Sequence, residues 1–365
     1  MNLVWGIVIG VIALTVLVVL HELGHALVAR RNGVRVEEFG IGFPPAAYKK
    51  KVKKSFLGKN VVYSVNWLPL GGFVKLQGEH DDDKKPGDYG AATFWQKTKI
   101  LLAGVMMNWL TAVILLTILA WFGLPQLVPH QFTVASDTHV IYNPVVLASI
   151  EKDLPAENAG LKSGDAVISV NGEKIETSAQ LSEVSAAHKG EMVRVTYKRD
   201  GTERVAHVAL RSANDDKRGY LGAGLSQERL TRSTWSAPIV GVGVTMQLTG
   251  ITLQGLGQVI GDGVSGLVMK LMPNDSAQKQ ANQKLSSASQ SVGGPLSIFG
   301  ILFPAAERAG VRYVVMMTAL ISLTLAVMNI LPIPALDGGR WFVTAVFRLL
   351  KKPLTKEREE KIHGT

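Results

Sequence analysis

The sequence predicts a multi-span α-helical membrane protein that carries a membrane-associated β-hairpin and one inserted domain outside the membrane, an α+β composition. Of the 365 residues, 47% are hydrophobic, and many of them gather in long uncharged runs such as 3–20 and 100–124. About 20 consecutive apolar residues are enough to cross a bilayer as a helix. Residues 134–212 break this pattern with short alternating strands, charged residues and turns, as expected for a small β-rich domain.

The basic residues stand beside the apolar runs. The net charge is +10, and the segment from Arg30 to Lys59 alone holds nine Lys/Arg against two acids. Crowding of Lys and Arg next to membrane spans marks cytoplasmic loops, so the charge predicts topology and argues against nucleic-acid binding. The chain has no cysteine, which excludes disulfides and cysteine nucleophiles. Its N-terminus lacks the basic region and cleavage site of a removed signal peptide, so we interpret it as a retained span.

The first predicted span, residues 3–29, contains the sequence His21-Glu22-Leu23-Gly24-His25. On a helix, His21 and His25 lie about 40° apart and one turn from each other, so both imidazoles can bind one metal ion. Glu22 points about 100° away from His21 and is placed to act as a general base. Ionisable groups at membrane depth are costly and normally mark a functional site. A metal centre is therefore favoured over a pair of hydrogen-bonded core histidines.

This span is expected to run from the outside to the inside, so the metal centre lies near the cytoplasmic side. Residues 61–76 then form two short β-rich runs joined by a Pro/Gly-Gly turn. If this hairpin dips towards the metal centre, its backbone could pair with an extended substrate segment; an ordinary surface hairpin is the alternative. The acidic stretch 79–83 is expected to be a solvated loop and not a second metal cluster.

The second span, 100–124, leads outward, which predicts that the β-rich domain is extracytoplasmic. On this span Gly104 and Asn108 lie one turn apart, as suits close packing against another helix. Within the domain, segment 158–172, with its two punctuating glycines and an Asn-Gly turn, resembles the core signature of a PDZ domain. PDZ domains bind chain ends or extended segments at a sheet edge.

A later span, residues 313–336, leads directly into Asp337, with a basic tail beyond it. If the uncharged run 235–259 also crossed the membrane, Asp337 would reach the outer leaflet, away from His21 and against the basic tail. We therefore expect 235–259 to be an amphipathic or partly embedded helix. The same topology brings Asp337 to the depth of the histidines. A carboxylate there can be the third ligand, which leaves one coordination position for water.

Together these features resemble the site-2 protease family of intramembrane zinc metalloproteases, and most closely the bacterial regulator-of-sigma-E type with a single PDZ domain. The resemblance covers nearly the whole chain. It rests on segment 21–25, the PDZ signature 158–172, Gly-Gly-Pro-Leu-Ser-Ile at 293–298, and Asn-Ile-Leu-Pro-Ile-Pro-Ala-Leu-Asp-Gly-Gly at 329–339. Val105 departs from the family, which commonly has proline there. The family also commonly has a further span after the aspartate-bearing one.

The resemblance implies that His21, His25 and Asp337 bind zinc and that Glu22 is the general base. It also implies that one asparagine and the hairpin hold the substrate segment. The candidate substrate-binding residues are Asn329, Tyr63, Val65, Gly71, Gly72 and Phe73.

The implied activity is regulated intramembrane proteolysis of single-span membrane proteins, such as membrane-bound anti-sigma factors and remnant signal peptides, after an upstream site-1-type protease has cut them. The implied location is the bacterial inner membrane, with the PDZ domain outside as a size gate or docking module and the lipid bilayer as the surroundings. Two other classes are considered: a non-catalytic scaffold, which would have no use for Glu22, and a metal-ion transporter, for which few other intramembrane acids are present.

Five regions are expected along the chain. They are an N-terminal membrane core with the hairpin and second span (1–125), a PDZ domain (130–215), an amphipathic linker region (230–308), a C-terminal span carrying Asp337 (309–350) and a basic tail (351–365).

Overall fold

The computed structural model describes residues 3–216, 218–270 and 298–363, which form two compact units. The first unit comprises residues 1–119 and 238–365, and the second comprises residues 120–237. The segment 293–298, which contributed to the family resemblance, lies outside the described residues except for Ile298.

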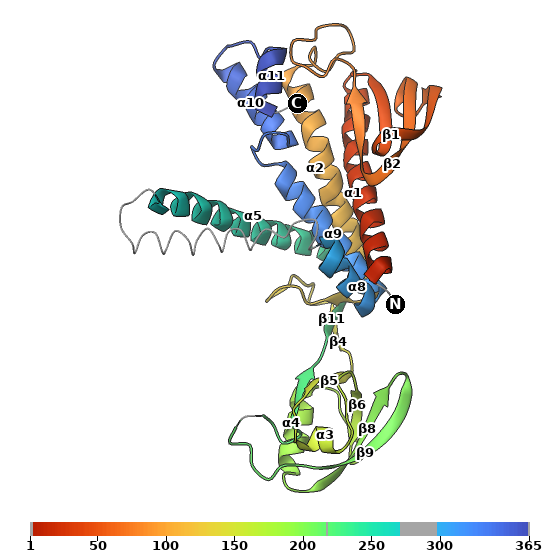
Figure 1. The fold of residues 1–365 in the computed structure, drawn as a ribbon, viewed down its shortest axis with the longest axis vertical. Coiled ribbons are helices and arrows are strands. Elements are labelled where there is room, and N and C mark those ends of the chain that lie inside the picture. Colours follow the sequence, from red (N-terminus) through yellow and green to blue (C-terminus); the bar gives the residue numbers. More distant parts are fainter. Residues whose placement is uncertain (1–2, 217, 271–297, 364–365) are drawn as a thin grey trace. The chain divides into compact units, whose positions relative to one another are not determined.

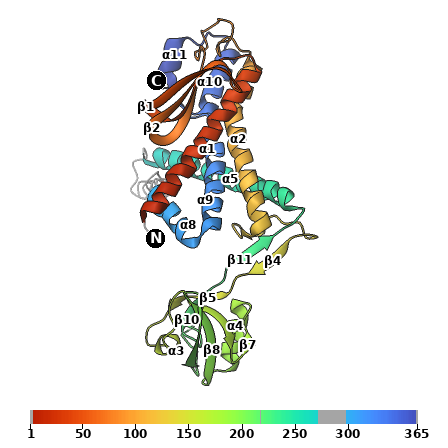
Figure 2. The ribbon, with the colours of Figure 1, turned by 90° about the vertical axis from the view of Figure 1, so that its right-hand side faces the viewer.

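Four of the described helices are long and apolar enough to cross a membrane, as the prediction of a multi-span protein requires. They are α1 (Leu3–Arg31), α2 (Phe94–Phe122), α5 (Ala237–Lys270) and α9 (Val311–Asn329). The shorter helices are η1 (Ile298–Leu302), α8 (Phe303–Ala309), α10 (Asp337–Leu349) and α11 (Lys356–His363). In the first unit α1, α2 and α9 lie side by side (Figures 1 and 2).

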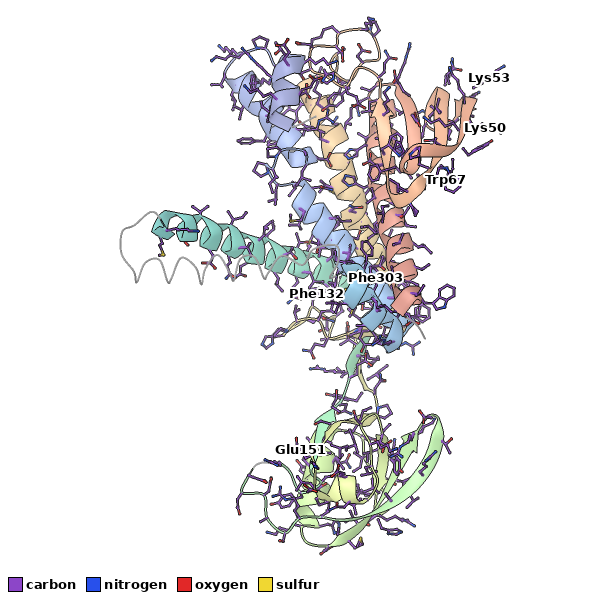
Figure 3. All side chains as sticks on the ribbon, viewed as in Figure 1. Lys50, Lys53, Trp67, Phe132, Glu151 and Phe303 are labelled. Atoms are coloured by element: carbon purple, nitrogen blue, oxygen red, sulfur yellow. The ribbon has the colours of Figure 1, made fainter. Side chains whose placement is uncertain are left out.

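Glycines allow α1 to pack closely against its neighbours. Phe303 of α8, which Figure 3 labels, is fully buried against Gly10, where an added Cβ would lie 2.7 Å from the phenyl ring. Further along α1, a Cβ on Gly24 would lie 2.6 Å from the carbonyl oxygen of Ala103 on α2. Small residues at such contacts let helix backbones approach each other. The approach at Gly24 brings α2 against the segment of α1 that carries the two histidines.

From Ala237 onward, the uncharged run 235–259 lies in α5, a single helix of 34 residues. Its helical structure is therefore confirmed. The portion Ala237–Gly266 also has the length and composition of a membrane span. A surface or partly embedded position for this helix stays a prediction.

The expected C-terminal span 309–350 is not one helix. Helix α9 ends at Asn329 and α10 begins at Asp337. Pro332 and Pro334 stand between them, and proline lacks the amide hydrogen that a continuing helix needs. The prediction was wrong in placing Asp337 at the end of the span, because it opens a separate short helix.

The long strands β1 (Val36–Ser55) and β2 (Gly58–Leu76) form an antiparallel pair that turns after β1. The first part of β1 has partners on both sides: Phe39 pairs with Val74 and also with Tyr63. The two β-rich runs of β2 therefore flank one segment of β1 and do not pair with each other. The predicted hairpin, closed at the Pro/Gly-Gly stretch, was wrong because β1 lies between its two arms.

The acidic stretch 79–83 is an ordered, partly buried loop. Glu79 accepts a hydrogen bond from the Leu76 N–H at 2.9 Å, and Asp81 pairs with the buried ammonium of Lys97. The Asp81 N–H also donates to Glu359 of α11 at 3.1 Å. The prediction of a solvated loop was therefore only partly correct, since several of its polar groups bond within the protein.

The second unit is rich in strands, as predicted. Its main antiparallel sheet has the order β10-β5-β6-β8-β9, with β7 beside β6, and a smaller sheet has the order β3-β11-β4. Two helices, α3 (Pro155–Asn158) and α4 (Ser178–Ala187), accompany the sheets. The strands are β3 (Leu124–Pro125), β4 (His139–Tyr142), β5 (Val145–Ile150), β6 (Ala166–Val170), β7 (Glu173–Lys174), β8 (Met192–Arg199), β9 (Thr202–Ala209), β10 (Ala223–Ser226) and β11 (Arg229–Arg232). The main sheet extends beyond the predicted PDZ boundary at residue 215.

A buried ion pair stabilises the segment that resembles the PDZ signature. Asp165 accepts two hydrogen bonds of 2.6 Å from the guanidinium of Arg199 and one of 2.8 Å from the Lys162 N–H. Burial alone would raise the pKa of Asp165, but these bonds to the ionised carboxylate outweigh burial and lower it. The signature thus contains an anionic group that fixes the turn before β6.

Candidate metal centre

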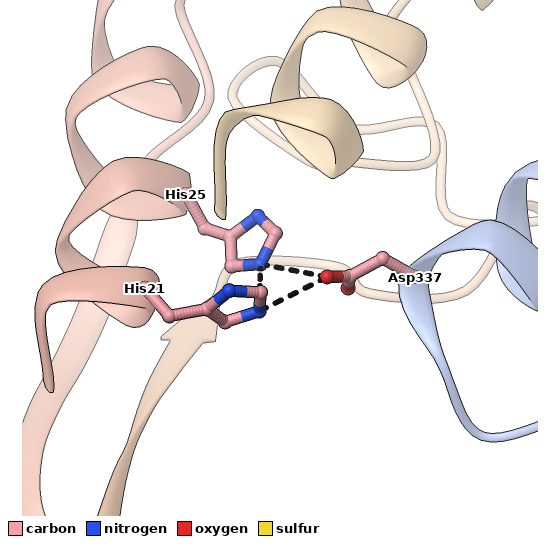
Figure 4. Close-up of side chains that lie close together, drawn as sticks. All are labelled: His21, His25 and Asp337. Carbon is pink, nitrogen blue, oxygen red and sulfur yellow. Dashed lines mark hydrogen bonds and ion pairs between the residues drawn. The ribbon is translucent and has the colours of Figure 1, made fainter. Parts of the chain in front are cut away.

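Three side chains converge where α1 faces the start of α10 (Figure 4). His21 Nε2 and His25 Nε2 lie 3.1 Å apart, and Asp337 Oδ2 lies 3.0 Å from the first and 3.2 Å from the second. Both imidazoles are buried, and the carboxylate is 18% exposed. Across the described ranges, this is the one group of His and acidic side chains found close enough together to hold a metal ion. The structure thus brings together the three predicted ligand residues.

The second nitrogen of His25 determines which ring nitrogen faces the cluster. His25 Nδ1 lies 2.7 Å from the backbone carbonyl oxygen of Ile100. A carbonyl oxygen can only accept, so Nδ1 carries the hydrogen. In the neutral imidazole, Nε2 then presents its lone pair to Asp337 and His21, which is the orientation of a metal-binding histidine.

Asn108 on α2 lies beside His21 Nδ1, as the Ile100 carbonyl lies beside His25 Nδ1. Its side-chain amide lies 3.3 Å from His21 Nδ1, and its Oδ1 is buried with no hydrogen-bond partner within the described ranges. The oxygen and nitrogen of an amide are assigned from their hydrogen-bond network. Exchanging them pairs Asn108 Oδ1 with the Nδ1–H of His21 and leaves the His21 Nε2 lone pair facing the cluster.

The donor set fits a divalent cation. Two imidazole nitrogens and one carboxylate oxygen approach one another within 3.2 Å, and buried electron-rich atoms repel unless a cation or proton lies between them. Two histidines and one carboxylate are a known set of zinc ligands that leaves a fourth position open.

Gly104 of α2 forms the wall of the cluster. A Cβ at this position would lie 2.4 Å from His25 Nε2 and 2.7 Å from His21 Nε2, the two atoms that face the metal position. The sequence interpretation treated Gly104 and Asn108 as helix-packing residues. Their one-turn spacing was the available signal, but it did not show that they contact the histidines.

Two glycines after Asp337 set the position of its carboxylate. A Cβ on Gly338 would lie 2.2 Å from the carbonyl oxygen of Ile330, and one on Gly339 would lie 2.0 Å from that of Ile333. The first turn of α10 therefore rests directly on the backbone between α9 and α10. This contact places Asp337 opposite the histidines.

Glu22 lies between the cluster and the edge of β2. Its Oε2 accepts a hydrogen bond of 3.0 Å from the backbone N–H of Val74. Glu22, Val74 and His25 all line a cavity of about 230 Å³, together with Asp337. Glu22 is not part of the ligand cluster, but its carboxylate faces the same cavity as His25 and Asp337.

Four of the predicted substrate-binding residues lie at this cavity, at the ligand cluster or against α1. Asn329 Nδ2 is 3.4 Å from His21 Nε2, and Phe73 lines the cavity. Gly71 and Gly72 precede Phe73, and a Cβ on Gly72 would lie 3.0 Å from the side chain of Val19 on α1. This part of β2 therefore pairs with β1 on one side and faces α1 on the other.

Tyr63 and Val65 are placed differently. Tyr63 pairs with Phe39 and Lys50, and Val65 pairs with Ile41 and Tyr48. Because both residues have strand partners on two sides, their backbone offers no open edge to a substrate strand. Strand addition at these two positions is contradicted by the structure.

The role of Asn108 gives a first prediction. Asn108→Leu should weaken metal binding by about 10- to 100-fold, because the acceptor that orients His21 is lost. Metal affinity is measured by competition with a chromogenic chelator on the purified protein. Ser322→Ala is the matched control: it removes the hydrogen bond to the Asn108 backbone carbonyl and leaves the amide in place. Equal affinities for the Leu variant and the parent would contradict this role.

Apolar helices that suit a membrane, joined to a buried cluster of two histidines and an aspartate beside a glutamate that is not part of the cluster, define a membrane metallopeptidase. The chain belongs to peptidase family M50, whose model matches residues 9–364. This match confirms the predicted resemblance to the site-2 proteases.

Curated relatives span most of the chain. The zinc metalloprotease RasP of Geobacillus kaustophilus is 26% identical over 98% of this chain and 93% of its own length. The regulator of sigma-W protease RasP of Bacillus subtilis is 24% identical over 94% of this chain and 90% of its own. A Clostridium acetobutylicum protein with a zinc metalloprotease name is 30% identical over 93% of this chain and 86% of its own length. Among solved structures, the PDZ domain of the SdrC-like protein from Listeria monocytogenes matches 24% of this chain and 92% of its own length. The sequence identity is 28% and the TM-score is 0.22.

Proposed function

We propose that this protein is an intramembrane zinc endopeptidase that cuts the membrane-spanning segments of single-span proteins. The observation that carries the proposal is the convergence of His21, His25 and Asp337 beside Glu22, within a unit whose main helices suit a membrane. Membership of a peptidase family and the metalloprotease names of the relatives support the hydrolytic activity and zinc as the metal. The sigma-W regulator name of one relative supports membrane-bound anti-sigma factors as a substrate class.

In this proposal His21 Nε2, His25 Nε2 and Asp337 Oδ2 hold the zinc ion. When bound, zinc supplies a Lewis acid that polarises a peptide carbonyl and lowers the pKa of water to about 7. Glu22 takes a proton from the attacking water on its carboxylate and delivers it to the amide nitrogen that leaves. Asn329 Nδ2 lies close enough to the cluster to donate a hydrogen bond to the substrate carbonyl oxygen.

The edge of β2 from Gly71 to Val74 would hold the substrate. A substrate helix uses its backbone groups in internal hydrogen bonds, so its carbonyls become available only when the segment is extended. An extended segment can add to a strand edge through backbone hydrogen bonds. The Val74 N–H, which faces Glu22, supports this edge as the place where substrate meets the catalytic residues.

The topology is part of the same proposal. Arg30 and Arg31 end α1, and the basic run that follows supports a cytoplasmic position for this end of the helix and for the metal centre. The β-rich domain, predicted at 130–215, would then lie outside the cytoplasm. There it would dock or sieve substrates that an upstream site-1-type protease has already shortened.

The test is cleavage of a single-span model substrate by the purified full chain in detergent. Cleavage should stop after zinc is removed by a chelator and return when about one equivalent of zinc is restored. Mass spectrometry of the products should place the cut within the apolar segment. A soluble peptide of the same length without an apolar segment is the control substrate. Cleavage that persists in the chelated protein would refute the zinc mechanism, and cuts confined to residues outside the apolar segment would refute the intramembrane specificity.

A further inference from the structure

A second cavity lies away from the metal centre, between the end of α1, the start of β1 and the turn after β1. Its volume is about 670 Å³. None of the residues assigned above to metal, catalysis or substrate lines it. The cavity is therefore a separate feature of the first unit.

Four cationic side chains line this cavity. They are Arg30, Arg35, Lys51 and Lys59, and the one acidic residue of the lining is Glu37. Glu37 pairs with a residue outside the cavity, since its carboxylate lies 3.2 Å from the ammonium of Lys75. No ion pair recorded in the described ranges involves any of the four cations, although Arg30 donates a hydrogen bond to the Phe56 carbonyl. Uncompensated positive groups around a concave surface attract anions.

The cavity lies where the apolar part of α1 has ended. Helix α1 has 29 residues and a length of about 44 Å, which exceeds the hydrocarbon thickness of about 30 Å. Arg30 stands at the last turn, beyond the uncharged run, at the level expected for lipid headgroups. Phe56 lies in the turn after β1, next to Leu57 of the cavity lining, and is 58% exposed, as suits an aromatic side chain at a membrane interface.

We propose that this cavity binds the phosphate-bearing headgroup of an anionic glycerophospholipid. The guanidinium groups of Arg30 and Arg35 would bind the phosphate, because their planar donors match two oxygens at once. Lys51 and Lys59 supply additional positive charge. The cavity is larger than a single phosphate ion requires, and the exposed Phe56 offers an apolar contact for the glycerol and the first acyl carbons. This proposal is independent of the protease activity.

The test measures binding of a short-chain phosphatidylglycerol to the full-length protein in detergent, by native mass spectrometry across a lipid titration. The double variant Arg35→Gln/Lys59→Gln should bind this lipid about 20-fold more weakly, since each basic residue near a lipid surface contributes measurably to attraction. The matched control is Lys50→Gln/Lys53→Gln. Figure 3 shows these two lysines at the outer side of the same sheet, and neither lines the cavity. The control should bind like the parent although it loses the same charge.

Further variants and competing probes complete the design. Arg35→Lys/Lys59→Arg keeps both charges but removes the planar donor pair of Arg35, so its affinity should lie between those of the parent and of Arg35→Gln/Lys59→Gln. The thermal midpoint of each variant checks folding. Short-chain phosphatidylcholine and inorganic phosphate are titrated as competing probes, and neither should displace the anionic lipid at matched concentration. Equal weakening in both Gln double variants, no weakening in either, or equally effective displacement by inorganic phosphate would overturn the proposal. Zinc content and substrate cleavage, measured on the same preparations, report separately on the protease function.

Discussion

Glu22→Gln is expected to lower the turnover of a single-span substrate by about 10³-fold while the protein keeps about one zinc ion per chain. Gln has nearly the same shape and can still accept the hydrogen bond from the Val74 N–H, but its amide cannot accept the proton of water. The ligand cluster does not include Glu22, so the metal should remain bound. Single-turnover cleavage rates and metal content, measured on the same sample, check this result.

The control for this variant is Glu38→Gln. Glu38 bonds to Ser64 and Lys49 and does not line the cavity beside the cluster. Its replacement should leave turnover within about twofold, because Gln can still accept the hydrogen bond from Ser64 and the side chain does not reach the cluster. If Glu22→Gln instead lost the metal, Glu22 would be a ligand, and unchanged turnover would favour a non-catalytic scaffold or a transporter.

Gly104→Ala is expected to remove bound metal from the protein, with at least about a 100-fold loss of affinity and a corresponding loss of cleavage. The new methyl group would lie 2.4 Å from His25 Nε2, far inside van der Waals contact. Either α2 moves away from α1 or the imidazole rings turn, and both changes break the geometry of the cluster. Metal content after purification in excess zinc is the measurement.

Gly250→Ala is the matched control, because Gly250 also lies in a long apolar helix and an added Cβ would meet nothing within 4 Å. The control should retain metal and fold like the parent. Retention of a full zinc equivalent by Gly104→Ala, at unchanged affinity, would show that the space beside the rings can expand and would contradict the proposed crowding.

The metal cluster could be predicted because its information is local or topological. His21 and His25 are spaced by one helical turn, and counting spans brought Asp337 to their depth. The roles of Gly104 and Asn108 depend on which face of α2 meets α1. A sequence pattern gives the periodicity of each helix but not the rotation of one helix against another.

The hairpin shows a second limit of the sequence. Tyr63 and Phe73 stand in similar β-rich runs of one segment, so both were predicted to present substrate. Their difference comes from the first part of β1, which lies between the two runs and pairs with both. The glycines and prolines at 39–45 disfavour a continuous helix there but do not specify the order of the strands. Pairing between distant segments depends on tertiary packing that local propensity does not specify.

In the proposed mechanism, the hydrogen bond between Glu22 and the Val74 N–H would make the Glu22 carboxylate a competitor of the substrate. A carbonyl of an added strand needs the same donor, and one backbone hydrogen cannot fully satisfy both acceptors. Pairing of the substrate at this edge would therefore release the Glu22 oxygen as the peptide arrives. The resting protein would keep its base engaged, and the extended conformation of the substrate would itself be the signal that frees it.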